Sequence, residues 1–318
     1  MKIFKWFAVS VLAATIVPAL AAEAHCPGNV ASVPFRLVNR HWIVLALSID
    51  HQGPYNFLLD SGAQITMIDP SLATALHLDT QRAAVITGVG SGQSASYAQL
   101  GLVEAGSHSV ANQKVLVHDL QNLHAADLRL QGILGEDFLE QFDLLIDNAH
   151  RLLCLDDSAA MRAEVKGPHI PLVVTAEADE VGAMPGLLLI TVQLSGGLRP
   201  VRLVLDSGAN EPILFNSSQY MLVRPSHYVP LSGSGVDGAQ PVLSVLPPQD
   251  VKIGSLKLPG VAFLSTTTGK DCFAKGFDGV LTTGSSGASS SITPIALPSL
   301  SPDRTEDDGM RNPQLDAR

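Results

Sequence analysis

The sequence is short of charge, and of positive charge in particular. Only 16% of its 318 residues are charged, and 20 Lys and Arg face 30 Asp and Glu, which gives a net charge of −10. Nucleic acids and anionic membrane surfaces both attract clustered cations, so this balance argues against either as a partner. The sequence contains no C-x-x-C or H-E-x-x-H motif and its ten histidines are scattered, so we expect no metal site.

Cysteine is also scarce. The three cysteines are Cys26, Cys154 and Cys272, and an odd number cannot all pair within one chain. An exported protein could still form one disulfide. A bridge between Cys26 and Cys154 would tie the start of the first half of the chain to its end.

No hydrophobic run is long enough to span a membrane. The longest apolar stretch near the start, Phe7 to Ile16, follows Lys2 and Lys5 and precedes Ala19-Leu20-Ala21. A positive start, a short apolar segment and an A-x-A site are typical of a cleavable secretory signal. We therefore predict a signal peptide over residues 1–21 and a periplasmic or secreted product without a stable membrane anchor.

One seven-residue motif, called the repeated phrase below, occurs twice in the sequence. Phe57-Leu58-Leu59-Asp60-Ser61-Gly62-Ala63 returns as Leu203-Val204-Leu205-Asp206-Ser207-Gly208-Ala209. Each copy places a carboxylate at the end of a β-type apolar run. A strand-like segment and a polar turn precede each copy, at Trp42 to Ile49 and at Leu187 to Leu194. Both phrases are therefore predicted to follow a β-hairpin.

Two further landmarks repeat downstream in the same order. Glycine-rich tips start 28 and 27 residues after the two aspartates, and apolar pairs start 73 and 74 residues after them. Such matched spacing indicates a duplicated unit. The tips contain Gly88, Gly90 and Gly92 in the first copy and Gly233 and Gly235 in the second. The apolar pairs are Ile133-Leu134, which Gly135 follows, and Val280-Leu281, which Thr282 follows.

The repeat predicts an all-β protein with two lobes. We expect the first lobe at residues 22–158, a linker at 159–171 and the second lobe at 172–284. The second copy stops short, because residues 285–318 have a composition that favours disorder where the first copy continues with Phe138 to Leu155. A natural tail and a change of reading frame near Gly284 both fit this departure.

The repeated residues resemble those of retropepsin-like aspartic proteases, and more narrowly the exported bacterial aspartyl protease family proteins with two lobes on one chain. The resemblance covers about residues 35–157 fully and 185–284 in part. It implies two retropepsin- or pepsin-like β-barrel lobes, the second incomplete at its C-terminal end. It also implies a cofactor-free endopeptidase whose Asp60 and Asp206 activate a water molecule.

The resemblance assigns supporting roles to the neighbouring residues. Ser61 and Ser207 would hydrogen-bond across the lobes, and the glycine tips would form flaps over the substrate. Close backbone approach would require Gly62 and Gly208, with Ala63 and Ala209 in the same tight space. Ile133, Leu134 and Gly135 would pack beneath Asp60.

Two other functions fit the same residues. The chain could be a catalytically weak or inactive peptide-binding protein of the cell envelope, since its second copy is incomplete. If the second lobe is defective, a homodimer could pair Asp60 with Asp60 of a second copy. In each case the expected partner is a peptide or protein segment in extended conformation.

Overall fold

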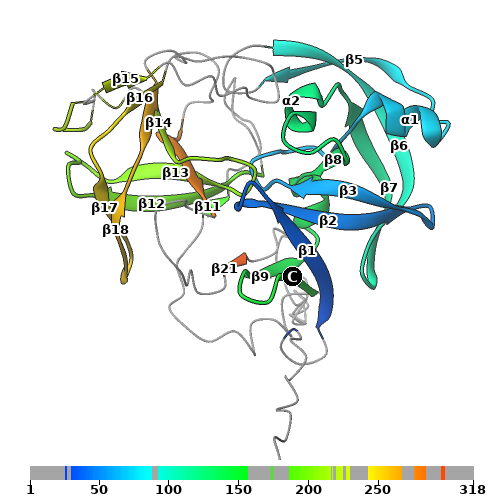
Figure 1. Cartoon of the computed structure of the whole chain (residues 1–318), viewed down its shortest axis with the longest axis horizontal. Coiled ribbons are helices and arrows are strands. Elements are labelled where there is room, and N and C mark those ends of the chain that lie inside the picture. Colours follow the sequence, from blue (N-terminus) through cyan, green and yellow to red (C-terminus); the bar gives the residue numbers. More distant parts are fainter. Residues whose placement is uncertain are drawn as a thin grey trace, which may run out of the picture.

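The structure is a computed structural model that describes residues 26, 30–87, 92–156, 173–174, 186–215, 217, 220–224, 227–229, 243–266, 276–283 and 295–297. Strands dominate these residues and form two sheets, one in each half of the chain (Figure 1). The expected all-β, two-lobed architecture is confirmed. No helix among the described residues is long and apolar enough to cross a membrane.

The first lobe contains a sheet of 11 strands among the described residues, in the order β21-β9-β10-β1-β2-β3-β8-β4-β7-β6-β5. A further pairing of β2 with β6 folds this sheet over on itself, but the end strands do not close it into a strict barrel. Its strands are β1 (Ala31–Val38), β2 (Trp42–Ile49), β3 (Gln52–Leu59), β4 (Met67–Ile68), β5 (Gln81–Thr87), β6 (Gly92–Ala105), β7 (His108–Val117), β8 (Leu130–Leu134), β9 (Asp143–Asp147), β10 (Leu152–Asp156) and β21 (Ile295–Leu297). The helices of this lobe are α1 (Pro70–Ala75), α2 (Gln121–His124) and α3 (Glu136–Leu139).

The second lobe repeats the central part of this arrangement. Its described strands follow the path β15-β16-β19-β14-β20-β13-β12-β17-β18, with β11 paired to β12. They are β11 (Val173–Val174), β12 (Leu188–Leu194), β13 (Val201–Asp206), β14 (Ile213–Phe215), β15 (His227–Val229), β16 (Leu243–Val245), β17 (Gln249–Ile253), β18 (Leu256–Val261), β19 (Leu264–Thr266) and β20 (Gly279–Thr282).

Burial patterns explain where each strand lies. In β12 the side chains of Val192 and Leu194 are buried whereas Thr191 and Gln193 are exposed, which is the alternation of a strand with one wet face. By contrast, all four residues of β20 are buried, as expected of a parallel strand covered on both faces. A single cluster of buried apolar side chains includes residues of both lobes, so the two sheets share one core.

The same central pairing occurs in each lobe. Strand β3 runs parallel to β8 with Leu59 opposite Leu134, and β13 runs parallel to β20 with Leu205 opposite Leu281. Parallel neighbours end at the same edge of a sheet. The Asp-Ser-Gly turn of each repeated phrase therefore begins at the sheet edge where the apolar pair of the parallel strand also ends. That pair lies more than 70 residues later in the sequence.

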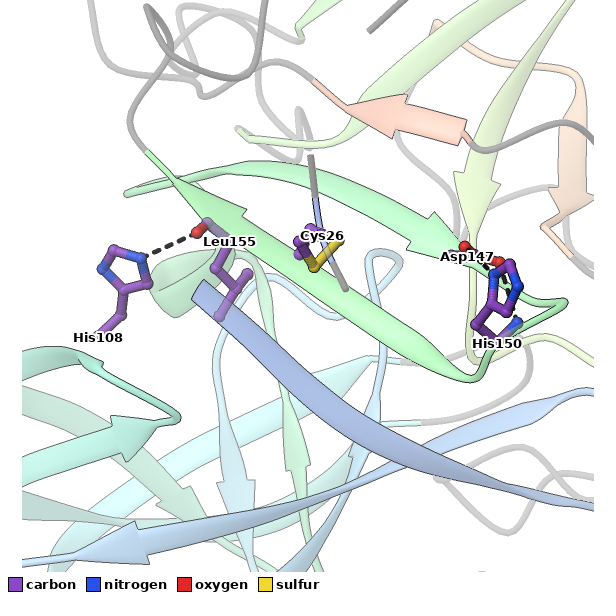
Figure 2. Close-up of a disulfide and its surroundings, with 6 residues drawn as sticks. Cys26, His108, Asp147, His150 and Leu155 are labelled. Carbon is purple, nitrogen blue, oxygen red and sulfur yellow. Dashed lines mark hydrogen bonds and ion pairs between the residues drawn. A yellow bond between two sulfur atoms is a disulfide. The ribbon is translucent and has the colours of Figure 1, made fainter. Parts of the chain in front are cut away.

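A disulfide joins Cys26 to Cys154, the pairing considered from the sequence. Figure 2 shows Cys26 against β10, which belongs to the hairpin that ends the first lobe. His108 Nε2 lies 2.9 Å from the carbonyl oxygen of Leu155 at one end of this hairpin, and His150 Nδ1 lies 2.7 Å from Asp147 Oδ2 at its turn. The bridge anchors the residues that precede β1 to the last strand of the lobe.

Replacing both Cys26 and Cys154 by alanine is expected to destabilise the chain. The bridge closes a loop with a sequence separation of 128. For a loop of this length, the chain-entropy model gives a loss of about 4–5 kcal/mol in the free energy of unfolding. Denaturant unfolding of the oxidised chain and the double variant measures the difference. Equal midpoints and slopes would show that the bridge contributes nothing.

The structure departs from expectation after β20. Residues 295–297, within the segment expected to be disordered, form β21 and pair with β9 of the first lobe (Figure 1). Among the described residues, no counterpart of the β9–β10 hairpin follows β20 in the second lobe. The predicted signal peptide, the linker at 159–171 and the remainder of the tail lie outside the described residues.

Candidate active site

Asp60 and Asp206 occupy equivalent places in the two lobes. Asp60 follows β3, and its backbone N–H donates to the carbonyl of Leu134, N to O 3.0 Å. Asp206 is the last residue of β13 and lies opposite Thr282 of the parallel strand β20. The duplicated strands thus deliver one aspartate from each lobe to a common centre.

The two carboxyl groups meet there. Gly62, in the Asp60 turn, lies directly against the Asp206 carboxyl, and Gly208, in the Asp206 turn, lies directly against the Asp60 carboxyl. Backbone N–H groups of the adjoining turns donate to both carboxyls: Gly62 N to Asp60 Oδ1 at 2.8 Å, and Gly208 N and Ala209 N to Asp206 Oδ1, each at 2.8 Å. Each carboxyl is therefore fixed by its own turn and lies against the glycine of the other lobe's turn.

Burial governs the protonation of this pair. Burial is the largest cause that raises the pKa of Asp60 well above its ordinary value, and the charge of Asp206 raises it further. The pKa of Asp206 is also raised by burial, although hydrogen bonds from Ala209 and Gly208 oppose the change. Two such groups titrate as a pair, and the proton they share belongs to both.

Ser61 and Ser207 connect the two turns reciprocally. Ser61 Oγ donates to Leu205 O at 2.9 Å and accepts from Ser207 N at 3.1 Å. Ser207 Oγ donates to Leu59 O at 2.8 Å and accepts from Ser61 N at 3.0 Å. The expected hydrogen bonds across the lobes are thus present, and they are buried. They hold the two turns at a fixed separation.

The glycines of the repeated phrase lie directly against the opposite carboxyl. A Cβ on Gly62 would lie 2.5 Å from Asp206 Cγ, and a Cβ on Gly208 would lie 2.4 Å from Asp60 Cγ. Both distances are far shorter than a van der Waals contact. Only glycine at these positions leaves room for the paired carboxyls, and Ala63 and Ala209 complete the two turns.

Ile133, Leu134 and Gly135 lie beneath the first turn. Ile133 and Leu134 are fully buried in β8, and a Cβ on Gly135 would lie 2.8 Å from Ala63 O. In the second lobe, the position that corresponds to Gly135 holds Thr282, which is buried and whose Oγ1 has no hydrogen-bond partner among the described residues. The two halves of the centre are therefore similar but not identical.

Only part of the two glycine-rich tips lies within the described residues. Thr87 of β5 pairs with Gly92 of β6, so the first tip joins the two strands of a hairpin. Gly88 and Gly90 lie outside the described residues. Gly233 and Gly235, between the paired strands β15 and β16, also lie outside them. Their assignment as flaps remains a prediction.

Two residues at the start of β2 reach the second lobe, and sequence reasoning missed them. Trp42 Nε1 donates to Gly208 O at 2.8 Å, and His41 Nε2 lies 2.6 Å from Asn210 Oδ1. Trp42 is buried. A tryptophan next to a histidine at a strand start was the available signal, but the partners of the two residues lie more than 160 residues away in sequence.

Substitution of Trp42 by phenylalanine is expected to lower the free energy of unfolding. The ring packing is largely kept, but the carbonyl of Gly208 loses its donor, at a cost of about 1–3 kcal/mol for a buried group. Denaturant unfolding measures this effect, with Tyr55→Phe as a control that removes a polar atom elsewhere in the first lobe. If the two variants behave alike, Trp42 does not position the Asp206 turn.

A polar network below the first turn was also missed. Asp137 Oδ1 accepts from Thr66 N at 2.9 Å and from Thr66 Oγ1 at 2.7 Å, while Gly135 N donates to Thr66 Oγ1 at 3.1 Å. The adjacent Glu136 is buried, and its N–H donates to Ala63 O at 2.8 Å. Glu136 and Asp137 lie between apolar residues in the sequence, and this position was the available signal for a buried polar network.

Two repeated lobes bring their carboxyls together at paired strand ends, and carboxyls so placed can accept and donate protons. Residues 45–138 match the family described as Aspartyl protease. Among solved structures, a retropepsin-like aspartic protease from Rickettsia conorii is similar, with 20% identity, a TM-score of 0.29, and coverage of 40% of this chain and 91% of that chain. The comparison with curated proteins gives no match.

The match to the Aspartyl protease family lies on the lobe that carries Asp60 and spans less than half of the chain. Within the described residues, no group of three or more His, Cys, Asp or Glu side chains is placed to hold a metal ion.

Proposed function

We propose that the chain is an aspartic endopeptidase in which Asp60 and Asp206 together activate a water molecule against a peptide bond. The close approach of the Asp60 and Asp206 turns, delivered by two copies of one strand and turn, carries this proposal. Two carboxyls in contact hold one proton between them, because ionising both in a buried site is costly. One group can then act as base while the other acts as acid.

The proton transfers balance over the reaction. The ionised carboxylate takes a proton from water as the water oxygen bonds to the peptide carbon, and the protonated carboxyl gives its proton to the carbonyl oxygen. The product is a neutral gem-diol. When the C–N bond breaks, the pair donates a proton to the nitrogen and takes one from the diol. One proton then remains on the pair, ready for the next cycle.

An extended peptide is the substrate that this architecture favours. Strand β5 ends the first-lobe sheet, so its outer edge pairs with no other described strand. The β5–β6 hairpin also ends in the first glycine tip. A peptide in β conformation can hydrogen-bond to such backbone edges while its scissile bond lies over the carboxyls. The intramolecular pairing of Asp60 with Asp206 makes a second copy of the chain unnecessary for this centre.

We also propose that the protein works outside the cytoplasm. The Cys26–Cys154 disulfide supports this location, since such bonds persist mainly in oxidising compartments. The signal-like segment at residues 1–21 supports it independently.

Cleavage of an unfolded protein substrate tests the proposed reaction. Purified chain is incubated with the substrate from about pH 4 to pH 7, the range in which carboxyl pairs share a proton, with and without a pepstatin-type inhibitor. New N-termini that disappear with inhibitor support the endopeptidase. Inhibitor binding without any cleavage would instead indicate a peptide-binding protein.

A further inference from the structure

Strand β9 is buried on both faces, so each of its edges needs a partner. Leu144, Leu145 and Ile146 of β9 are all buried. Leu144 and Ile146 belong to the apolar cluster that both lobes share, whereas Leu145 packs in a separate cluster with Cys26 and Cys154. Backbone N–H and C=O groups in such a position are costly to leave unpaired. Strand β10 satisfies one edge of β9.

The other edge of β9 is covered by the tail that follows the second lobe. Strand β21 pairs with this edge in antiparallel orientation and lies beside β9 in Figure 1. The register places three consecutive tail residues on the edge: Ile295 opposite Ile146, Ala296 opposite Leu145, and Leu297 opposite Leu144. The last strand of the first-lobe sheet therefore comes from residues that follow the whole second lobe in the sequence.

The sequence of the tail suits a short extended segment at this place. Pro294 and Pro298 stand on either side of Ile295-Ala296-Leu297. A residue that precedes proline is biased towards extended backbone, which favours the β conformation at Leu297. Proline also lacks the N–H that a longer ladder requires, so the two prolines favour pairing of the three residues between them alone. Sequence and pairing thus agree on the same three residues.

The tail also connects parts of the molecule that belong to different lobes. It begins after β20, where Thr282 lies opposite Asp206. It then pairs with β9, whose hairpin partner β10 is tied to Cys26 by the disulfide at Cys154. In the first lobe the chain instead continues from β8 through α3 into β9 of the same sheet. Among the described residues, the strand that follows β20 thus lies in the opposite lobe.

We propose that the edge of β9 opposite β10 is a strand-acceptor surface, and that residues 295–297 of the chain's own tail bind it as a latch that holds the second lobe against the first. The latch does not depend on catalysis. When β21 leaves β9, the backbone groups of that edge open to water and one connection between the lobes is lost. The Asp60 and Asp206 turns belong to different lobes, so the latch also keeps these turns together.

Hydrogen exchange of the full chain, followed by mass spectrometry, tests whether β21 covers β9. The variant Ala296→Pro/Leu297→Pro removes two consecutive N–H groups, which point to opposite sides of a strand, so one of them faces β9. We expect the β9 amides that face β21 to exchange about 10-fold faster or more. Ser299→Pro/Leu300→Pro is the matched control, because it adds the same prolines beyond the paired residues. Unchanged exchange in β9 would overturn the proposal.

The same experiment reports on the contact between the lobes. Ser61 N donates to Ser207 Oγ at 3.0 Å and Ser207 N donates to Ser61 Oγ at 3.1 Å, so both amides are protected while the lobes are closed. If the latch holds the lobes, both amides exchange faster in the latch variant. Faster exchange in β9 alone would contradict the latch, because β21 would then cover an edge without joining the lobes.

A milder variant keeps the test decisive if the two prolines prevent folding. Ala296→Gly retains every N–H but loosens the tail, and it should change the exchange of β9, Ser61 and Ser207 in the same direction by a smaller factor. Equal exchange in Ala296→Gly and the unaltered chain, together with an unfolded proline variant, would count against the latch.

Sedimentation of the unaltered chain identifies which molecule supplies β21. We expect a monomer, as the tail of the same chain requires. A dimer that the two prolines convert to monomers would assign β21 to a second copy and overturn the latch. None of these measurements needs activity, so a chain that cleaves nothing but shows the expected exchange would refute the proposed function and leave the latch standing.

Discussion

Asp206→Asn is expected to lower kcat/KM for peptide cleavage by about 10³-fold or more, because the pair then loses a group that takes and returns protons. The asparagine side chain would keep the size of the original and an oxygen for the N–H groups of Gly208 and Ala209. The variant therefore removes acid–base chemistry while leaving most of the geometry. Asp60→Asn should cause a loss of similar size, since neither carboxyl works without the other.

A matched control separates chemistry from charge. Asp250→Asn changes an exposed aspartate of the same lobe, and an asparagine oxygen can still accept from Gly260 N–H as Asp250 Oδ1 does at 3.0 Å. Its activity should equal that of the unaltered chain. Retention of cleavage by Asp206→Asn would show that the second lobe supplies no catalytic group, and the reaction would have to be assigned to Asp60 alone.

Gly208→Ala is expected to give the second largest loss, about 10²-fold in kcat, although it adds a single methyl group. The new Cβ would lie 2.4 Å from Asp60 Cγ, so the Asp60 carboxyl must move. Displacement of a reacting group by about 1 Å costs a loss of this order. Overpacking should also lower the free energy of unfolding by about 1–3 kcal/mol. Gly62→Ala should act alike through Asp206.

Gly254→Asn provides the comparison for this variant. Gly254 lies in the second lobe with φ +56° and nothing within 4 Å of an added Cβ, and asparagine tolerates this left-handed conformation. We expect normal kcat for this control. A Gly208→Ala variant with normal kcat and normal stability would be incompatible with the close approach of Gly208 to Asp60.

Local repetition allowed much of the centre to be predicted. Two equal phrases at the ends of apolar runs, followed by apolar pairs at equal spacing, indicated a duplicated unit, and the family resemblance implied that Asp60, Asp206 and both serines come together. That inference worked because parallel pairing of β3 with β8, and of β13 with β20, converts equal spacing in sequence into equal position in space. The Cys26–Cys154 pairing, one of several possibilities in the sequence, was settled only by the three-dimensional structure.

Features present in one copy only could not be predicted in this way. The contacts of Trp42 with Gly208 and of His41 with Asn210 depend on how the lobes face each other, which no local pattern encodes. The burial of Glu136 depends on the packing of α3 beneath the Asp60 turn. Strand β21 was missed for a different reason: its backbone pairs with β9 in a segment whose composition favours disorder.

The reciprocal serine bonds have a consequence for how the chain matures. Each bond joins turns separated by 144 to 148 residues, so the centre can form only after both lobes have been synthesised and have closed on each other. Contacts of such long sequence separation carry a large entropy cost and form late in folding. A partly made or partly folded chain holds its two aspartates apart, so the proposed proteolysis cannot begin before both lobes have closed.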